Sequence, residues 1–210
     1  MFSRFGKGRG QGAGGHGEER SRPSRGWAEV LSYLKGNESL RVLDFGTTSP
    51  QNINFLTALG HSVYMANVVQ DANRPEWQRT SESGEPEYDI EGFVKSSLDF
   101  SGRDFDVILL WDTANFLPPA MVPAMFDRLG EVLRPQGKLL ALFHGKTEGP
   151  ETGFSRYQLS DTDQLTIVPA GDYPVRQVYQ MRQIEKLLEG YASTRFFLGK
   201  DNMREVIAVK

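Results

Sequence analysis

One stretch of the sequence, residues 41–50, most limits the folds open to this chain. The apolar run Val42–Phe45 indicates a strand, and Gly46 ends it. Pro50–Leu59 predicts a helix, because proline suits the first helical turn. Ser62–Ala66 then predicts a second strand. A strand, a helix and a strand in so short a span form a right-handed βαβ unit, which requires a parallel sheet.

The rest of the chain continues to alternate between helices and strands. Phe105–Trp111 is its most apolar run and lacks alternation, as expected of a central strand covered on both faces. The last two predicted strands pair antiparallel, because the short link between them cannot hold a parallel crossover. We therefore expect an α/β fold, with a doubly wound, mostly parallel, seven-stranded sheet and an antiparallel last strand. The predicted strands are 40–45, 62–66, 93–98, 105–111, 138–143, 194–198 and 204–209; the further helices are 27–35, 119–133 and 175–188; and a hairpin joins 157–159 to 165–168.

Composition excludes several function classes. The chain has 210 residues, of which 39% are hydrophobic, and a net charge of −3, which favours neither nucleic acid nor a membrane surface as a partner of the whole protein. The absence of cysteine excludes disulfides, thiolate zinc sites and a cysteine nucleophile. No apolar run is long enough to span a membrane. The three scattered histidines form no metal motif, so we predict no metal site. We expect one domain over residues 26–210, in the cytoplasm.

Residues 1–25 differ in composition from the remainder. They are rich in glycine, arginine and serine, and six basic residues against two acidic ones give this tail a net charge of +4. So few apolar side chains predict disorder. Two interpretations stay open: a solvated tail without a partner, or a contact with RNA or another acidic surface through residues 5–10. Nucleic acid is therefore expected, if at all, only through this tail.

Two segments interrupt the alternating pattern. Residues 69–91 are strongly acidic, with one helical turn expected around Trp77, and residues 145–174 are irregular apart from the hairpin. Loops of this length are commonly functional or mobile, although a solvated insertion has the same composition. The carboxylates of the acidic loop lack the spacing of a calcium site.

The order of these elements, with its reversed last strand, resembles that of class I S-adenosylmethionine-dependent methyltransferases over residues 27–210. The resemblance rests on the order and spacing of several segments together. The segments are Val42–Gly46, Leu98–Phe100, Phe105–Leu109, Leu133–Leu139 with its Pro-x-Gly turn, and Arg204–Ile207. The resemblance implies S-adenosylmethionine as the cofactor and a small molecule as the acceptor.

The resemblance also implies where the cofactor lies. Asp44 and Gly46 match the start of the family's glycine loop, beside the methionine part of the cofactor. The family usually has Gly-x-Gly-x-Gly there, because a backbone so close to a ligand leaves no room for side chains. In this chain the second and third glycines are Thr48 and Pro50. This departure permits either a variant loop that still binds the cofactor or a site that has decayed.

Further positions carry over from the family in the same way. Asn67 falls where an acidic residue usually accepts hydrogen bonds from the ribose hydroxyls, and an amide binds more weakly than a carboxylate. Asp99 and Phe100 fall where the adenine edge is contacted. Asp112 follows the fourth predicted strand, at the rim where cofactor and acceptor meet.

Methyl transfer from a sulfonium needs in-line positioning and only sometimes a general base. The candidate bases are Asp112 and His144, each at the predicted carboxyl end of a strand, although a histidine there also commonly serves a structural role. Motifs for a nicotinamide cofactor and for a hydrolase nucleophile are both absent. Two function hypotheses follow: an S-adenosylmethionine-dependent methyltransferase for a small-molecule acceptor, or a catalytically inactive methyltransferase-like protein that serves as a binding or scaffold module.

Overall fold

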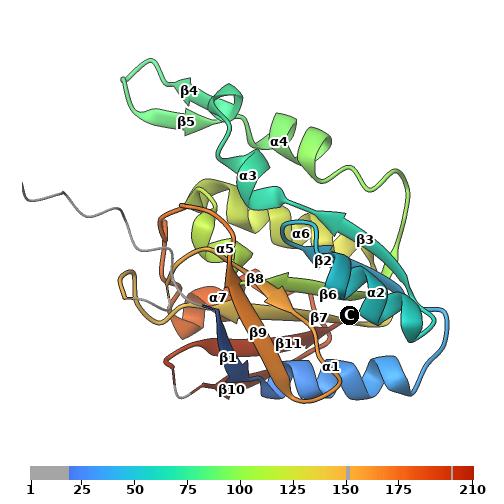
Figure 1. The fold of residues 1–210 in the computed structure, drawn as a ribbon. Coiled ribbons are helices and arrows are strands. Elements are labelled where there is room, and N and C mark those ends of the chain that lie inside the picture. The colour runs from blue at the N-terminus through green and yellow to red at the C-terminus, as the bar shows by residue number, and fades with distance from the viewer. Residues whose placement is uncertain (1–18, 150–151, 200) are drawn as a thin grey trace, which may run out of the picture.

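The structure is a computed structural model that describes residues 19–149, 152–199 and 201–210 (Figure 1). Strands and helices alternate through most of the chain. The strands are β1 (Arg20–Pro23), β2 (Arg41–Phe45), β3 (Ser62–Ala66), β4 (Gln78–Thr80), β5 (Pro86–Tyr88), β6 (Phe105–Trp111), β7 (Leu133–Phe143), β8 (Ser155–Gln158), β9 (Gln164–Pro169), β10 (Ser193–Leu198) and β11 (Arg204–Val209). The helices are α1 (Arg25–Lys35), α2 (Pro50–Ala58), α3 (Val68–Ala72), α4 (Ile90–Ser97), α5 (Thr113–Phe116), α6 (Val122–Val132) and α7 (Met181–Leu187), with the short 3₁₀ helices η1 (Pro75–Trp77) and η2 (Pro119–Met121).

The central sheet has six strands in the order β10-β11-β7-β6-β2-β3. Strands β3, β2, β6 and β7 run parallel, and β11 lies antiparallel between β7 and β10. The doubly wound, mostly parallel sheet with an antiparallel last strand is therefore confirmed. The predicted count of seven strands is wrong by one.

The missing strand was expected at residues 93–98, but residues 93–97 belong to helix α4 and Leu98 caps its end. Asp89 caps this helix by accepting a hydrogen bond from the Gly92 amide at 3.0 Å. Ile90, Phe93 and Val94 then follow helical spacing, and Phe93 is fully buried. A window that begins at Phe93 holds the aromatic and β-branched pair Phe93–Val94 but omits both the cap and Ile90, so it does not show the helical spacing. Strand β3 is consequently the last strand on its side of the sheet.

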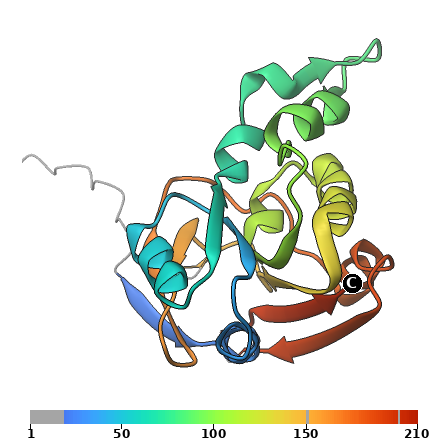
Figure 2. The same cartoon turned by 90° about the vertical axis from the view of Figure 1, so that its right-hand side faces the viewer.

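Two apolar cores lie on opposite faces of the central sheet (Figures 1 and 2). One core joins the sheet to helices α3 to α7. The other joins it to α1, α2 and a second, three-stranded sheet of order β1-β9-β8. Strands β6 and β7 contribute to both cores, as the apolar run Val107–Trp111 of β6 predicts.

The three-stranded sheet corrects one expectation and confirms another. Arg20–Pro23, expected within the disordered tail, pairs antiparallel with β9, so the ordered part of the chain begins before residue 26. Residues 1–18 of that tail lie outside the described residues. The hairpin expected between 157–159 and 165–168 is confirmed as β8 and β9.

Helix α7 is shorter than the predicted helix 175–188 because tertiary hydrogen bonds hold its expected first half. The amides of Arg176 and Gln177 donate to the carbonyl of Asn115 at 2.7 and 3.3 Å. The Asn115 side chain donates back to the Gln177 carbonyl at 2.7 Å. These bonds keep the segment extended, so the helix begins only at Met181.

The acidic segment 69–91 is more ordered than expected. It contains α3, the expected helical turn as η1, and the β4–β5 hairpin, which projects from the body (Figure 1). Within the described part of the chain, no helix is both long and apolar enough for a membrane span.

The start of helix α2 is stabilised by a side-chain cap, which can be tested by mutation. Ser49 is buried, and its side chain caps α2 by accepting a hydrogen bond from the Asn52 amide at 3.2 Å. Ser49→Ala should lower the free energy of unfolding by about 1 kcal/mol, because it leaves that amide without its acceptor. The control is Thr57→Ala on the exposed side of the same helix, which should change stability by less than about 0.5 kcal/mol. Equal effects in urea unfolding would contradict the capping role.

Candidate functional site

The strand order locates the candidate site. From β2 the chain crosses to β3 on one side, and the next parallel strand, β6, lies on the other side of β2. In open α/β sheets, ligands bind at the carboxyl ends of the strands where the order reverses in this way. That point lies between Asp44 near the end of β2 and Trp111 at the end of β6. We call this place the crevice.

The turn after β2 has an ordinary backbone despite its lost glycines. None of residues 46–50 has a positive φ, so Thr48 is unstrained there. Pro50 occupies the first turn of α2, where a missing N–H leaves no hydrogen bond unmade. The Gly46 amide donates to the carbonyl of Ala66 at 2.9 Å, which ties the turn to β3. The departures from the glycine pattern are therefore compatible with the local fold.

Asp44 is the buried acidic group of the crevice, with 1% of its surface exposed. One carboxylate oxygen accepts from Trp111 Nε1 at 2.7 Å, and the other accepts from Asn52 Nδ2 at 2.9 Å. Burial raises the pKa of Asp44 to about 6, although both hydrogen bonds favour the ionised form and oppose this shift. Each oxygen thus has a partner from the chain itself.

The backbone of Trp111 explains how its ring reaches Asp44. Its φ is +53°, which is unusual for a bulky side chain. The pairing of β6 with β7 also shifts register between Leu109 and Trp111. Such irregularities turn a side chain away from the regular alternation of a strand and are frequent at functional sites. Here the result is an indole that spans the crevice from β6 to β2.

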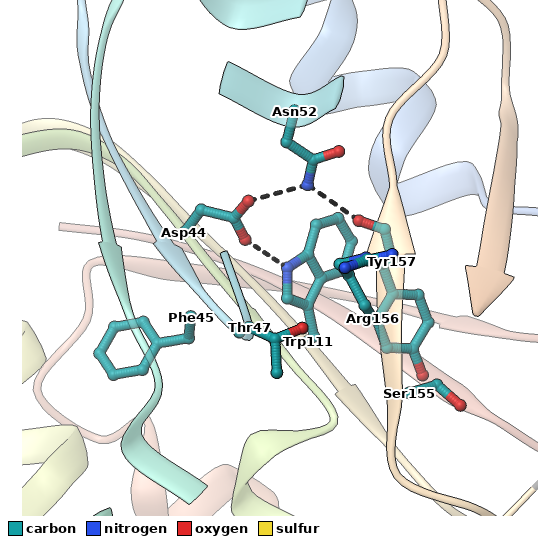
Figure 3. Close-up of a pocket in the computed structure, with 9 residues that line it drawn as sticks. Asp44, Phe45, Thr47, Asn52, Trp111, Ser155, Arg156 and Tyr157 are labelled. Carbon is teal, nitrogen blue, oxygen red and sulfur yellow. Dashed lines mark hydrogen bonds between the residues drawn. The ribbon is translucent and has the colours of Figure 1, made fainter. Parts of the chain in front are cut away.

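Strand β8 covers the crevice (Figure 3). The ring of Tyr157 stacks on Trp111 with centroids 4.9 Å apart and planes 11° apart. Asn52 Nδ2 donates to the Tyr157 carbonyl at 2.9 Å, and Asn52 Oδ1 accepts from the Leu159 amide at 3.0 Å. Asn52 therefore links β8, helix α2 and Asp44 in one buried network.

The space that remains is far smaller than a cofactor. The cavity beside Asp44 has a volume of about 10 Å³. That is room for about one water molecule, whereas small-molecule sites typically enclose roughly 300–1,000 Å³. With Trp111, Tyr157 and Asn52 as they lie here, the residues present do not fit S-adenosylmethionine.

The two candidate general bases lie together, next to the crevice. His144 Nε2 lies 2.9 Å from Asp112 Oδ2, and the same oxygen accepts a hydrogen bond from the Tyr157 hydroxyl at 2.8 Å. Burial, followed by the carboxylate of Asp112, raises the pKa of Tyr157, so its hydroxyl stays protonated and donates. Asp112 and His144 are each at most 2% exposed. Their predicted role as bases therefore requires that residues covering them move.

The other predicted cofactor contacts lie apart from the cavity. Asn67 caps helix α3, and its side-chain oxygen accepts from the Gln70 amide. Asp99 is exposed and accepts from the Ser101 amide at 2.8 Å. Phe100 is buried in the core, with its ring edge-on to Phe105 at 5.5 Å. The roles of these three residues stay predictions.

Sequence reasoning missed the three residues that fill the crevice. The sequence predicts Trp111 in a buried strand, Tyr157 in a hairpin strand and Asn52 in an ordinary helix. One signal was present for Trp111, since it directly precedes the candidate Asp112 at the carboxyl end of β6. Among the described residues, no group of three histidine, aspartate or glutamate side chains could hold a metal ion.

Comparison with known proteins identifies the fold. No family model matches the chain, and no curated protein matches its sequence. An S-adenosylmethionine-dependent methyltransferase from Methanosarcina mazei superposes with a TM-score of 0.51 at 16% identity, covering 88% of this chain and 97% of that one. Another from Clostridium acetobutylicum has a TM-score of 0.51 at 14% identity, covering 88% and 91%. This chain therefore has the fold of the class I S-adenosylmethionine-dependent methyltransferases.

Proposed function

We propose that this protein binds S-adenosylmethionine in the crevice between β2 and β6, and that it is a methyltransferase for a small-molecule acceptor. The observation that carries the proposal is the place of Asp44 within this fold. Its carboxylate lies at the strand-order reversal of a methyltransferase-like sheet, on the strand that leads into the Gly46 turn. Ligands of doubly wound sheets bind at that point. Because the crevice is filled in the conformation described, binding requires the cover over it to move.

A second candidate function has its own supporting observation. Trp111 joins the two walls of the crevice through Asp44, and Asn52 ties β8 across it. A site filled and hydrogen-bonded in this way is also what a catalytically inactive methyltransferase-like binding module would contain. The two candidates differ in one measurable property, which is whether any form of the protein binds the cofactor.

Calorimetric titration with S-adenosylmethionine and with its demethylated product tests the proposal. The titration uses the wild type and Tyr157→Ala, which removes the ring stacked on Trp111. We expect saturable binding of both ligands by Tyr157→Ala at least. If neither protein gives binding heat at millimolar ligand, the methyltransferase proposal is contradicted and the inactive binding module is the better account.

A further inference from the structure

We propose that β8 is an autoinhibitory strap, which keeps the crevice closed until the segment Ser155–Leu159 releases Asn52. This inference rests on the proposed function, because it describes how access to that same site is controlled. The segment is called the β8 strap below. Its main closing contacts are the stack of Tyr157 on Trp111 and the hydrogen bonds of Asn52.

In the part of the chain that the structure describes, strand β8 pairs with another strand along one edge only, and its other edge faces the crevice. Among the described residues of the small sheet, β8 is an edge strand that pairs only with β9, whereas β9 also pairs with β1. Strand β1 is anchored firmly, since Arg22 forms a buried ion pair with Glu205 and a second, partly exposed one with Asp201. Strand β8 can therefore leave the crevice while β9 and β1 stay in place. The central sheet loses none of its own pairing when this happens.

The side chains of Tyr157 and Leu159 are buried in the second core, whereas the polar contacts of the strap across the crevice are few and specific. Asn52 makes two hydrogen bonds to the backbone of the strap, one to the Tyr157 carbonyl and one from the Leu159 amide. Tyr157 adds the hydrogen bond of its hydroxyl to Asp112. Arg156 adds a long hydrogen bond of 3.4 Å to the Thr48 carbonyl in the turn after β2. Movement of this one short segment would thus free Asn52, Asp112 and the turn from their partners on the strap. It would also remove the ring stacked on Trp111, which itself stays bonded to Asp44.

Two polar atoms at the closed cavity are left without partners. Neither Thr47 Oγ1 nor Arg156 Nε has a hydrogen-bond partner among the described residues, although both atoms are buried. Both residues line the cavity beside Asp44. Buried polar groups without partners are destabilising, so the closed arrangement retains polar groups that an occupant of the crevice could satisfy.

The strap lowers the apparent affinity of the crevice for its ligand. When only an open minority of molecules can bind, the apparent dissociation constant rises by the inverse of that fraction. Tyr157→Ala and Asn52→Ala each remove a closing contact. We expect both variants to bind S-adenosylmethionine at least about tenfold more tightly than the wild type. Tyr33→Ala, a tyrosine of α1 outside the crevice, serves as the matched control and should bind like the wild type.

Calorimetry on these four proteins and hydrogen exchange on the wild type form the test. S-adenosylmethionine should increase amide exchange in the strap, especially at Leu159, without increasing it in β2 or β6. If the wild type binds S-adenosylmethionine as tightly as the two variants do, the strap is not autoinhibitory, and the proposed function still holds. If S-adenosylmethionine instead slows amide exchange in the strap of the wild type, the autoinhibitory role is also overturned. This measurement needs no variant, so it tests the proposal even if a variant fails to fold. If no protein binds, the proposed function fails and the strap fails with it.

Discussion

Replacing Glu205 with alanine should lower the free energy of unfolding by about 3–5 kcal/mol, because it removes the more deeply buried of the two carboxylates that pair with the buried Arg22. Glu205 Oε1 lies 2.8 Å from Arg22 Nη2, and both residues are almost fully buried. Burial alone lowers the pKa of Arg22, and Glu205 and Asp201 more than offset that effect. Without Glu205 the guanidinium retains only Asp201, which is itself one-third exposed.

Glu205 also organises the start of helix α1. Its Oε2 accepts from Ser24 Oγ at 2.9 Å and from the Gly26 amide at 2.6 Å. A Cβ on Gly26 would lie only 3.0 Å from that oxygen and 2.5 Å from Leu140, so the close approach requires glycine. The variant therefore leaves two further buried donors without an acceptor.

Urea unfolding of Glu205→Ala and of a control measures the effect. The control is Glu131→Ala, which removes a surface ion pair with Arg128 and should cost less than about 1 kcal/mol. A loss for Glu205→Ala no larger than for Glu131→Ala would show that β1 is not anchored by this carboxylate. Another contact would then have to hold β1 and β9 in place while the β8 strap moves.

The second large effect is a change of stability with pH that depends on Asp44. Its folded-state pKa of about 6 lies above the ordinary value of 3.8, so the folded protein holds this proton more tightly than the unfolded chain does. As the pH rises from about 4 to about 7, Asp44 should therefore lower the free energy of unfolding by about 2 kcal/mol. Asp44→Asn removes this dependence, so its stability relative to the wild type should rise by that amount over the same interval.

The comparison is made by urea unfolding of both proteins at a series of pH values. The variant also loses one acceptor, for either Trp111 or Asn52, but that loss is nearly the same at every pH and cancels from the difference. Asp112→Asn serves as a second variant for comparison, because it replaces another buried carboxylate, in the neighbouring hydrogen-bond network, while leaving Asp44 in place. A difference between Asp44→Asn and the wild type that stays constant with pH would contradict the raised pKa.

Local patterns predicted the elements that build the crevice. The turn from Gly46 to Pro50, the strands on either side of α2 and the apolar strand β6 all follow from short-range periodicity and from one well-placed proline. Helix α4 was misread because its cap, Asp89, lies four residues before the apolar run that suggested a strand. Helix α7 was overextended because Asn115, far away in sequence, holds residues 176–177 in an extended form.

The sequence by itself determined the parallel sheet and its reversed last strand, and it predicted the edge at which a ligand would lie. Those features depend on hydrophobic period and on short connections, which neighbouring residues specify. Only the tertiary structure decided that the crevice is filled. Trp111 meets Asp44 across 67 positions, and Tyr157 meets Trp111 from a separate sheet. Such contacts depend on a shift of strand register and on the docking of a hairpin, which no local pattern encodes.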